Sequence, residues 1–223
     1  MADGCLLYYI TDRTAFAPDE PTRRHCLMEK IAEAARAGVD YIQLREKDLS
    51  TRELESLAHE AVGVLNQLRT EKRELKTALL INSRTDIAIA TDADGVHLRS
   101  DDICASDVRR LWNSCSGDKQ GEPLIGVSCH SLAEVVQAHA GGATFAVFAP
   151  VFEKKDIPNT QPVGLTQLRE ACKVKIPVLA LGGVTLENAR SCLDAGASGI
   201  AAIRLFQEND IAEIVHELGP RSR

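Results

Sequence analysis

The sequence predicts a single α/β domain, a parallel (β/α)8 TIM barrel, because short apolar runs alternate strictly with amphipathic segments. Eight apolar runs are each followed by a stretch whose apolar residues have helical spacing. Near-continuous apolar strands indicate a sheet buried on both faces, and β–α alternation indicates parallel strands with crossover helices. Eight such units in 223 residues favour a compact barrel, since a doubly wound sheet would need fewer strands or an added domain.

The expected elements follow one another without a long linker or a low-complexity tract, so residues 1–223 form one domain in this interpretation. The expected strands are residues 6–11, 41–44, 78–82, 95–97, 124–128, 144–148, 178–181 and 199–203. The expected helices are residues 24–37, 51–69, 85–90, 106–115, 131–139, 165–172, 185–194 and 211–218. Glycines such as Gly38 and Gly196 stand where helix C-caps would lie. Two long loops, 12–23 and 152–164, follow strands, on the side where barrel enzymes carry their chemistry.

Composition excludes several classes of protein. The hydrophobic fraction is 44%, and 26 Lys and Arg against 32 Asp and Glu give a net charge of −6. This balance argues against a nucleic-acid partner, so a phosphate ligand would need a local basic pocket. No apolar run is long enough for a membrane span, and no basic segment precedes an apolar stretch at the N-terminus. The seven cysteines lack CxxC spacing and favour reduced thiols in a cytoplasmic protein.

The most informative segment is residues 41–47, where Gln43, Arg45 and Lys47 alternate with Leu44 and Glu46. In a strand, the period of two would place Gln43, Arg45 and Lys47 on one face. Arg offers a planar fork of donors and Lys a point charge, which together suit phosphate or pyrophosphate. An edge strand with a solvated charged face explains the segment alone equally well.

A glycine pair after the seventh expected strand is the second candidate for anion binding. Gly182 and Gly183 precede a helix that opens near Thr185. Glycine lets a phosphate approach the backbone, and the free amides of a helix N-terminus bind it. A tight turn would also explain the pair. Arg204, at the end of the eighth strand, is expected beside this turn and would add positive charge.

Further polar residues follow strands four, five and six. Asp101 and Asp102 are hard oxygen ligands of the kind that Mg2+ takes, although one of them could instead cap the next helix. His130 opens a helix, where a structural role is common. Lys154 and Lys155 lie in the loop after strand six, which could close over an anion. A solvated charge pair is the alternative interpretation of these lysines.

Together these segments resemble the thiamine phosphate synthase/TenI superfamily over nearly the whole chain. The matching stretches are residues 9–13 (YITDR), 43–48 (QLREKD), Asn82, 94–98 (DGVHL), 126–131 (GVSCHS), the glycine turn and the closing strand. The resemblance implies a (β/α)8 barrel. Synthases of this family join hydroxymethylpyrimidine diphosphate to hydroxyethylthiazole phosphate, giving thiamine phosphate and pyrophosphate.

The resemblance also implies roles for individual residues. The pyrimidine diphosphate would be held by Gln43, Arg45, Lys47 and Asn82, Mg2+ by Asp102, the reacting centre or leaving group by Ser128, and the thiazole phosphate by Gly183 and the end of strand eight. These small phosphorylated substrates and Mg2+ are the expected partners. Nucleic acid and membrane are not expected. A homodimer is compatible with the sequence, since barrels of this size often dimerise.

The chain departs from the usual synthase pattern at three places. Ser83 follows Asn82 where synthases usually have a second Mg2+-binding Asp. Arg99 and Ser100 replace the usual Gly-Gln, and the strand-six loop reads FEKK over residues 152–155 in place of a Thr-x-Thr-Lys element. Glu153 or Asp101 could replace the missing ligand, so the synthase remains the favoured interpretation.

Two alternatives stay open. TenI-type thiazole tautomerases move a proton without a metal, and His130 matches their acid–base position. Synthases can also carry His at this position, so His130 does not separate the two activities. A non-catalytic sensor that binds thiazole phosphate is the third hypothesis, because one metal ligand and the threonine pair are missing.

Overall fold

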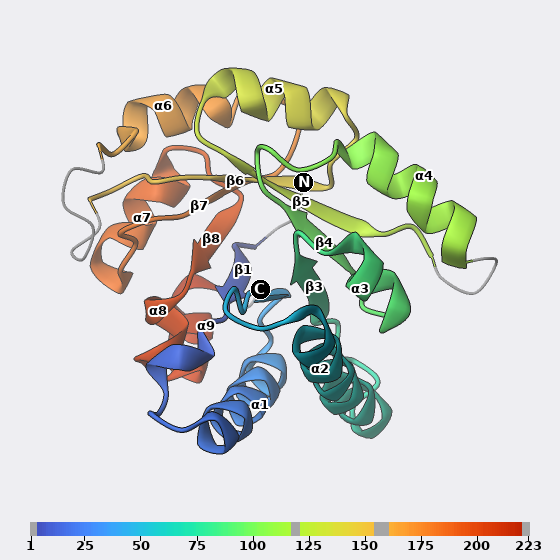
Figure 1. The fold of residues 1–223 in the computed structure, drawn as a ribbon. Helices are drawn as coiled ribbons and strands as arrows, with labels where there is room; N and C mark the ends of the chain where they lie inside the picture. The colour runs from blue at the N-terminus through green and yellow to red at the C-terminus, as the bar shows by residue number, and fades with distance from the viewer. Residues whose placement is uncertain (1–3, 117–120, 154–160, 220–223) are drawn as a thin grey trace.

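The chain folds into a closed barrel of eight parallel strands that are ringed by helices (Figure 1). The computed structural model describes residues 4–116, 121–153 and 161–219. Each strand pairs with the next in sequence, and β8 closes the barrel against β1. The predicted (β/α)8 barrel is therefore confirmed.

The strands match the predicted apolar runs to within one residue at their ends. They are β1 Leu6–Ile10, β2 Tyr41–Leu44, β3 Ala78–Asn82, β4 Gly95–Leu98, β5 Leu124–Cys129, β6 Phe145–Phe148, β7 Val178–Ala180 and β8 Gly199–Ala202. The register sets Gln43 beside Leu80, Asn82 beside His97, and His97 beside Gly126. The polar residues near the strand ends therefore come together at one rim of the barrel.

The helices also follow the predicted order, with two short additions. They are α1 Glu20–Ala37, α2 Thr51–Glu71, α3 Thr85–Ala90, α4 Ala105–Ser116, α5 Leu132–Ala140, α6 Gly164–Ala171, α7 Leu186–Asp194, α8 Arg204–Gln207 and α9 Ile211–Leu218, with the 3-10 helix η1 at Arg13–Ala15. Helices η1 and α8 were not predicted, because they have three and four residues and are too short to show a period in the sequence. Helix α1 begins earlier than expected because Asp19 caps it, accepting from Thr22 N at 3.0 Å.

Aromatic rings fill the barrel interior. Tyr41 stacks on Phe145 with ring centroids 4.9 Å apart, and Tyr8 meets Phe145 edge-on at 5.4 Å. Tyr8 and Phe145 belong to a buried cluster that also contains Ile10 and Leu80. Because the interior is a packed core, ligands must bind at the strand ends.

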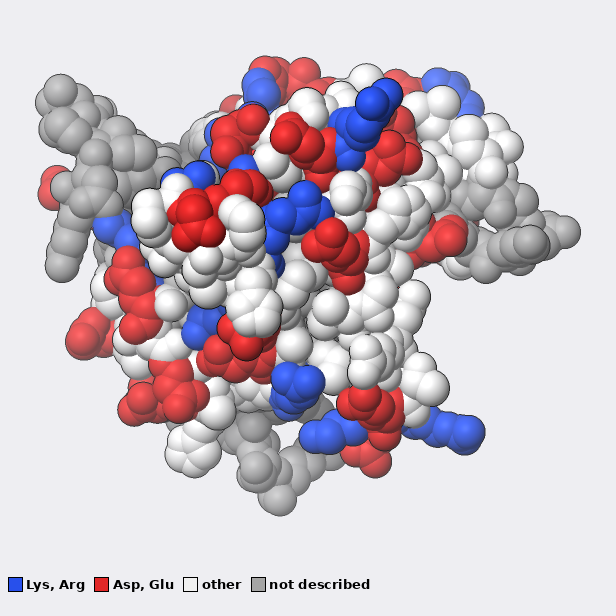
Figure 2. All heavy atoms as spheres, turned by 60° about the horizontal axis from the view of Figure 1, so that its bottom comes forward, with Lys and Arg blue, Asp and Glu red and all other residues white. Residues whose placement is uncertain are grey.

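Charges of both signs are interspersed on the face that Figure 2 presents. Basic side chains do not gather into one patch there, in keeping with the net charge of −6. In the described part of the chain, no helix combines the length and apolar character needed to cross a membrane.

Candidate active site

A buried ion cluster centred on Arg13 holds the segment that follows β2. Arg13 is only 2% exposed, and its guanidinium contacts Asp48 at 2.7 Å, Glu20 at 2.9 Å and Glu46 at 3.2 Å. Glu46 also accepts from Thr11 Oγ1 at 2.5 Å. Burial raises the pKa of Glu46, whereas the hydrogen bond from Arg13 lowers that of Asp48. The cluster ties the end of β2 to η1 and to the first residue of α1.

Arg45 and Lys47 lie beyond the end of β2, which stops at Leu44. The prediction that Gln43, Arg45 and Lys47 share one strand face was therefore wrong. The Arg45 N–H donates to Thr11 Oγ1 at 3.0 Å, which turns the chain out of the sheet. Arg45 is half-buried and Lys47 is exposed. The segment nevertheless keeps the two cations at the barrel rim.

Arg45 is a partly buried cation that is available to bind an anion. Burial lowers its pKa, and within the described residues its guanidinium forms no ion pair. The charges of Asp12 and Glu46 act on it without a direct contact in the described structure. A partly desolvated guanidinium gains stabilisation when an anion binds it. Arg45 therefore differs from Arg13, whose donors are already taken by carboxylates.

Gln43 and Asn82 form a buried amide pair beside Arg45. Gln43 is 1% exposed, and its Nε2 donates to Asn82 Oδ1 at 2.7 Å. Its Oε1 is buried with no partner among the described residues. An unpaired buried acceptor costs about 1–3 kcal/mol, which a ligand N–H group could recover. Ser83 follows with φ 58°, a left-handed conformation that is rare for serine and clusters at functional sites.

His97 is on β4 and points into the barrel, where its ring lies between Tyr8 of β1 and Ser128 of β5. Its Nδ1 is 3.0 Å from Tyr8 Oη, and its Nε2 is 2.9 Å from Ser128 Oγ. Burial is the main cause that lowers the pKa of His97 to about 3, and the charge of Arg45 adds to it. The ring is therefore neutral at physiological pH. His97 closes the fourth expected strand, 95–97, which made it a candidate, but the sequence indicated no specific role for it.

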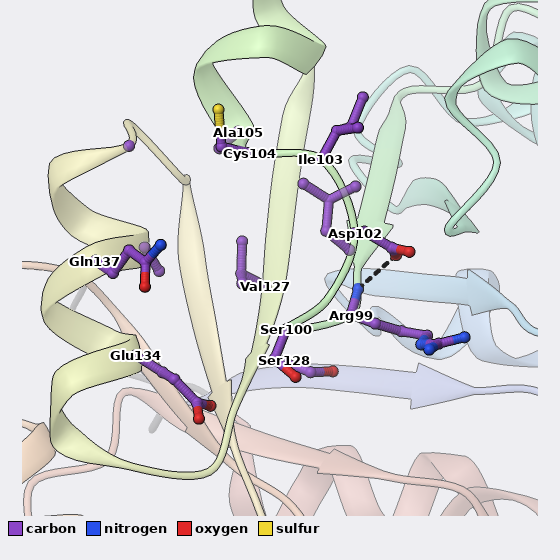
Figure 3. Close-up of a pocket in the computed structure, with 13 residues that line it drawn as sticks. Arg99, Ser100, Asp102, Ile103, Cys104, Ala105, Val127, Ser128, Glu134 and Gln137 are labelled. Atoms are coloured by element: carbon purple, nitrogen blue, oxygen red, sulfur yellow. Dashed lines mark hydrogen bonds between the residues drawn. The ribbon is translucent and has the colours of Figure 1, made fainter.

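The two aspartates after β4 lie on an exposed turn. Asp102 Oδ2 accepts from the Arg99 N–H at 2.7 Å, the dashed bond in Figure 3. Asp101 accepts hydrogen bonds from Nε and Nη2 of the Arg99 guanidinium, with Nε to Oδ1 at 2.9 Å, and these hydrogen bonds lower the pKa of Asp101. In the described ranges, no group of three or more His, Cys, Asp or Glu is arranged to hold a metal ion.

A crevice of about 80 Å³ flanks the mouth between the β4–α4 loop and α5. Asp102, Ser128 and Glu134 are among the residues that line it, as Figure 3 shows. Gln43 and Arg45 are not among them. Ligand pockets commonly measure roughly 300–1,000 Å³, so this crevice is a side feature and not a site for two substrates.

Gly182 and Gly183 form a turn that only glycine fits. Their φ angles are +97° and +65°, and a Cβ on Gly182 would lie 2.7 Å from Pro150 Cα. A Cβ on Gly183 would lie 2.4 Å from the Glu153 carbonyl oxygen. Close packing of the β6 and β7 loops therefore explains the glycines, and the same turn leaves backbone amides at the rim.

Helix α7 starts directly after this turn. The Thr185 N–H donates to Asn188 Oδ1 at 2.8 Å, and Asn188 Nδ2 donates to the Gly183 carbonyl at 2.9 Å. Among the described residues, the amides of Gly183 and Val184 have no acceptor. Free amides ahead of a helix N-terminus are an arrangement that binds phosphate. Arg204 is exposed at the start of α8, which follows β8.

His130 is exposed at the end of β5 and is anchored across to β6. Its Nδ1 is 2.8 Å from the Ala149 carbonyl, and its N–H donates to Glu134 Oε2 at 2.6 Å. A carbonyl only accepts, so Nδ1 carries a proton and the neutral ring has its lone pair at Nε2. Lys154 and Lys155, predicted to contact an anion, lie outside the described residues.

Comparison with known proteins identifies the family of this barrel. A model of the family described as "Thiamine monophosphate synthase" matches residues 7–206. The chain belongs to the thiamine monophosphate synthase family. A thiamine-phosphate synthase of Clostridium novyi is 36% identical over 208 residues, covering 92% of this chain and 91% of that protein. Another, from Syntrophomonas wolfei, is 36% identical over 201 residues and covers 88% and 86%.

A solved structure agrees with the family. Thiamine phosphate pyrophosphorylase from Pyrococcus furiosus superposes with a TM-score of 0.74 at 31% identity, covering 96% of this chain and 93% of that one. A geranylgeranylglyceryl phosphate synthase from Thermoplasma acidophilum has a TM-score of 0.64 at 18% identity and covers 96% and 92%, which shows the fold alone.

Proposed function

We propose that the protein is a thiamine-phosphate synthase that couples hydroxymethylpyrimidine diphosphate to hydroxyethylthiazole phosphate and releases pyrophosphate. The observation that carries the proposal is the juxtaposition at the end of β2. Arg45 is half-buried without an ion pair in the described residues, and the neighbouring Gln43 offers a buried acceptor with no partner there. This combination suits a ligand with an anion at one end and an N–H donor at the other.

The pyrimidine diphosphate would bind along the ends of β2 and β3. Gln43 Oε1 would accept from the exocyclic amino group of the pyrimidine, while Asn82 holds the Gln43 amide from its other side. Arg45 and Lys47 would contact the diphosphate. The C–O bond to the diphosphate then breaks, its electron pair leaves with pyrophosphate, and the positive charge is delocalised into the aminopyrimidine. Cations fixed in advance at the leaving group lower this barrier.

The thiazole phosphate would bind on the opposite side of the mouth. The free amides of Gly183 and Val184 and the N-terminus of α7 support a phosphate site there, to which Arg204 would add charge. The thiazole nitrogen would donate its lone pair to the exocyclic carbon of the pyrimidine, forming the new C–N bond. Because both substrates are held by their anionic groups, orientation supplies much of the rate.

The donor set at the end of β4 fits Mg2+ only together with substrate oxygens. Mg2+ usually binds one or two carboxylates and completes its shell with phosphates and water. Asp102 would hold it, since its Oδ1 is not the oxygen that bonds Arg99. The ion would neutralise charge on the departing pyrophosphate. Asp101, proposed as a second ligand, would first have to leave the Arg99 guanidinium.

The direct test incubates pure protein with both substrates, with and without Mg2+, and follows thiamine phosphate and pyrophosphate by mass spectrometry. We expect the two products in equal amounts with Mg2+ present. The Arg45→Ala variant should lose this activity, whereas Arg84→Ala, which removes a half-buried arginine already paired with Asp86, should keep it. Absence of product in every condition with the wild-type protein contradicts the synthase.

Thiazole tautomerisation is the second candidate, because the Ala149 carbonyl fixes the His130 ring with Nε2 as a proton acceptor. The same protein should then isomerise the thiazole carboxylate phosphate, and His130→Ala should abolish that reaction. Isomerisation that is unchanged in His130→Ala removes this candidate. Binding of thiazole phosphate without either reaction would favour the sensor.

A further inference from the structure

A chain of three hydrogen-bonded side chains runs from the barrel interior to its mouth. Tyr8 and His97 are 0% and 3% exposed, and Ser128 is half-buried at the end of β5. The Tyr8 Oη to His97 Nδ1 distance is 3.0 Å, and the His97 Nε2 to Ser128 Oγ distance is 2.9 Å. Within the described residues, Tyr8 and Ser128 are the only groups bonded to this imidazole.

The direction of these hydrogen bonds follows from counting donors. A neutral imidazole carries one N–H and one lone pair. If Nδ1 carried the proton, the Tyr8 hydroxyl hydrogen would be buried without an acceptor in the described structure, which is unfavourable. The Tyr8 O–H therefore donates to Nδ1, and the Nε2–H of His97 donates to Ser128 Oγ. Ser128 then accepts on this side, and its own hydrogen is free to point elsewhere.

The barrel makes room for this arrangement and holds it rigid. A Cβ on Gly126 would lie 2.8 Å from His97 Nδ1 and 2.6 Å from Phe145 Cζ, so the absence of a side chain admits both rings. Tyr8 is fixed between Tyr41 and Phe145, with edge-on ring contacts at 5.9 and 5.4 Å. Side chains from β1, β4 and β5 thus determine the orientation of a single hydroxyl.

We propose that Tyr8 and His97 are positioning residues that fix the Ser128 hydroxyl as a hydrogen-bond donor toward the barrel mouth. Resting on the proposed function, the acceptor would be an oxygen of the diphosphate, whose negative charge grows as the C–O bond breaks. A donor oriented before the reaction stabilises such charge without reorganisation. Tyr8 and His97 act only through Ser128.

The ring protonation can be measured without any activity. In protein labelled with 15N-histidine, NMR should show His97 protonated at Nε2 and unprotonated at Nδ1, with the signal assigned by its loss in His97→Gln. In Tyr8→Phe, the proton of the neutral His97 ring should no longer be confined to Nε2. Tyr41→Phe is the matched control, because it removes a hydroxyl from the same aromatic cluster without touching His97. A wild-type His97 protonated at Nδ1 contradicts the proposal even if Tyr8→Phe does not fold.

Kinetics then separate positioning from structure. Tyr8→Phe should lower kcat roughly tenfold, about the strength of one hydrogen bond, with little change in KM for the pyrimidine diphosphate. Tyr41→Phe should stay within about twofold, and Tyr8→Phe/Ser128→Ala should be no slower than Ser128→Ala alone. The proposal is overturned if the losses of kcat in Tyr8→Phe and Ser128→Ala multiply in the double variant. It is also overturned if Tyr8→Phe and Tyr41→Phe lower kcat equally. A wild-type protein with the expected tautomer and no synthase activity defeats the proposed function only.

Discussion

The end of β2 presents the cations Arg45 and Lys47, whereas the turn after β4 presents Asp101 and Asp102, and the two ends are built in different ways. After β2, Arg13 is 2% exposed and contacts three carboxylates, and this buried cluster fixes the segment that presents Arg45. After β4, Arg99 and Asp101 pair in solvent, with side chains 55% and 65% exposed. Buried charges must be partnered with good geometry, whereas exposed pairs exchange readily with water. We therefore interpret the cationic end as preformed and the acidic end as completed by ligands.

The largest expected difference between the two ends concerns catalysis. Arg45→Ala should lower kcat/KM about 10³-fold, because it removes a fixed cation at the leaving group. Arg99→Ala should cost less than about tenfold, since its guanidinium is directed to Asp101 on the surface. Steady-state kinetics with circular dichroism as a check of folding make the comparison. Equal losses in the two variants would show that the preformed end has no special role.

The second comparison concerns stability. Arg13→Met should lower the free energy of unfolding by about 3 kcal/mol, because Glu46 would be left buried without its cation. Arg99→Met should produce no measurable change. Urea unfolding of both variants measures this contrast, with the m-value as a check of two-state behaviour. A tolerated Arg13→Met would mean that the segment after β2 is held by other contacts.

The third comparison is within the acidic end itself. Asp102→Asn should raise the Mg2+ concentration for half-maximal activity about tenfold, a change of roughly 1.4 kcal/mol in binding. Asp101→Asn should leave this concentration nearly unchanged, because Asp101 is paired with Arg99. Titration of activity with Mg2+ separates the two variants. A larger effect of Asp101→Asn than of Asp102→Asn would mean that Asp101, and not Asp102, is the main Mg2+ ligand.

A pH-dependent contribution to stability comes from His97, inside the barrel. Its pKa in the folded protein is lowered to about 3, so the unfolded chain binds the extra proton as pH falls below about 6.5. His97 therefore contributes stability that is present above pH 6.5 and lost toward pH 3, by at most about 1.4 kcal/mol per pH unit. Between pH 6 and 4 the unfolding free energy of wild type should fall more steeply than that of His97→Gln. Parallel curves would mean that His97 is protonated in the fold.

The sequence was sufficient for the barrel because the strands are short, mainly apolar runs whose residues are largely buried on both faces. It also located Gln43 and Asn82, which the structure joins directly. It could not reveal the Arg13 cluster, since Arg13 and Asp48 are 35 residues apart and meet only in the folded chain. The period of two failed after Leu44 because the Arg45 N–H bonds a side chain of β1's loop instead of a strand. A tertiary contact of this kind leaves no local pattern.

We infer that the end of β2 forms an anion site without help from the acidic end. Calorimetric titration of inorganic pyrophosphate into the protein in EDTA tests it directly. We expect binding that is weakened at least about tenfold by Arg45→Ala and unchanged by Asp102→Asn. Added Mg2+ should then strengthen binding to wild type more than to Asp102→Asn. Pyrophosphate that fails to bind wild-type protein in EDTA, or binds equally well to Arg45→Ala, would show that the end of β2 is not a preformed anion site.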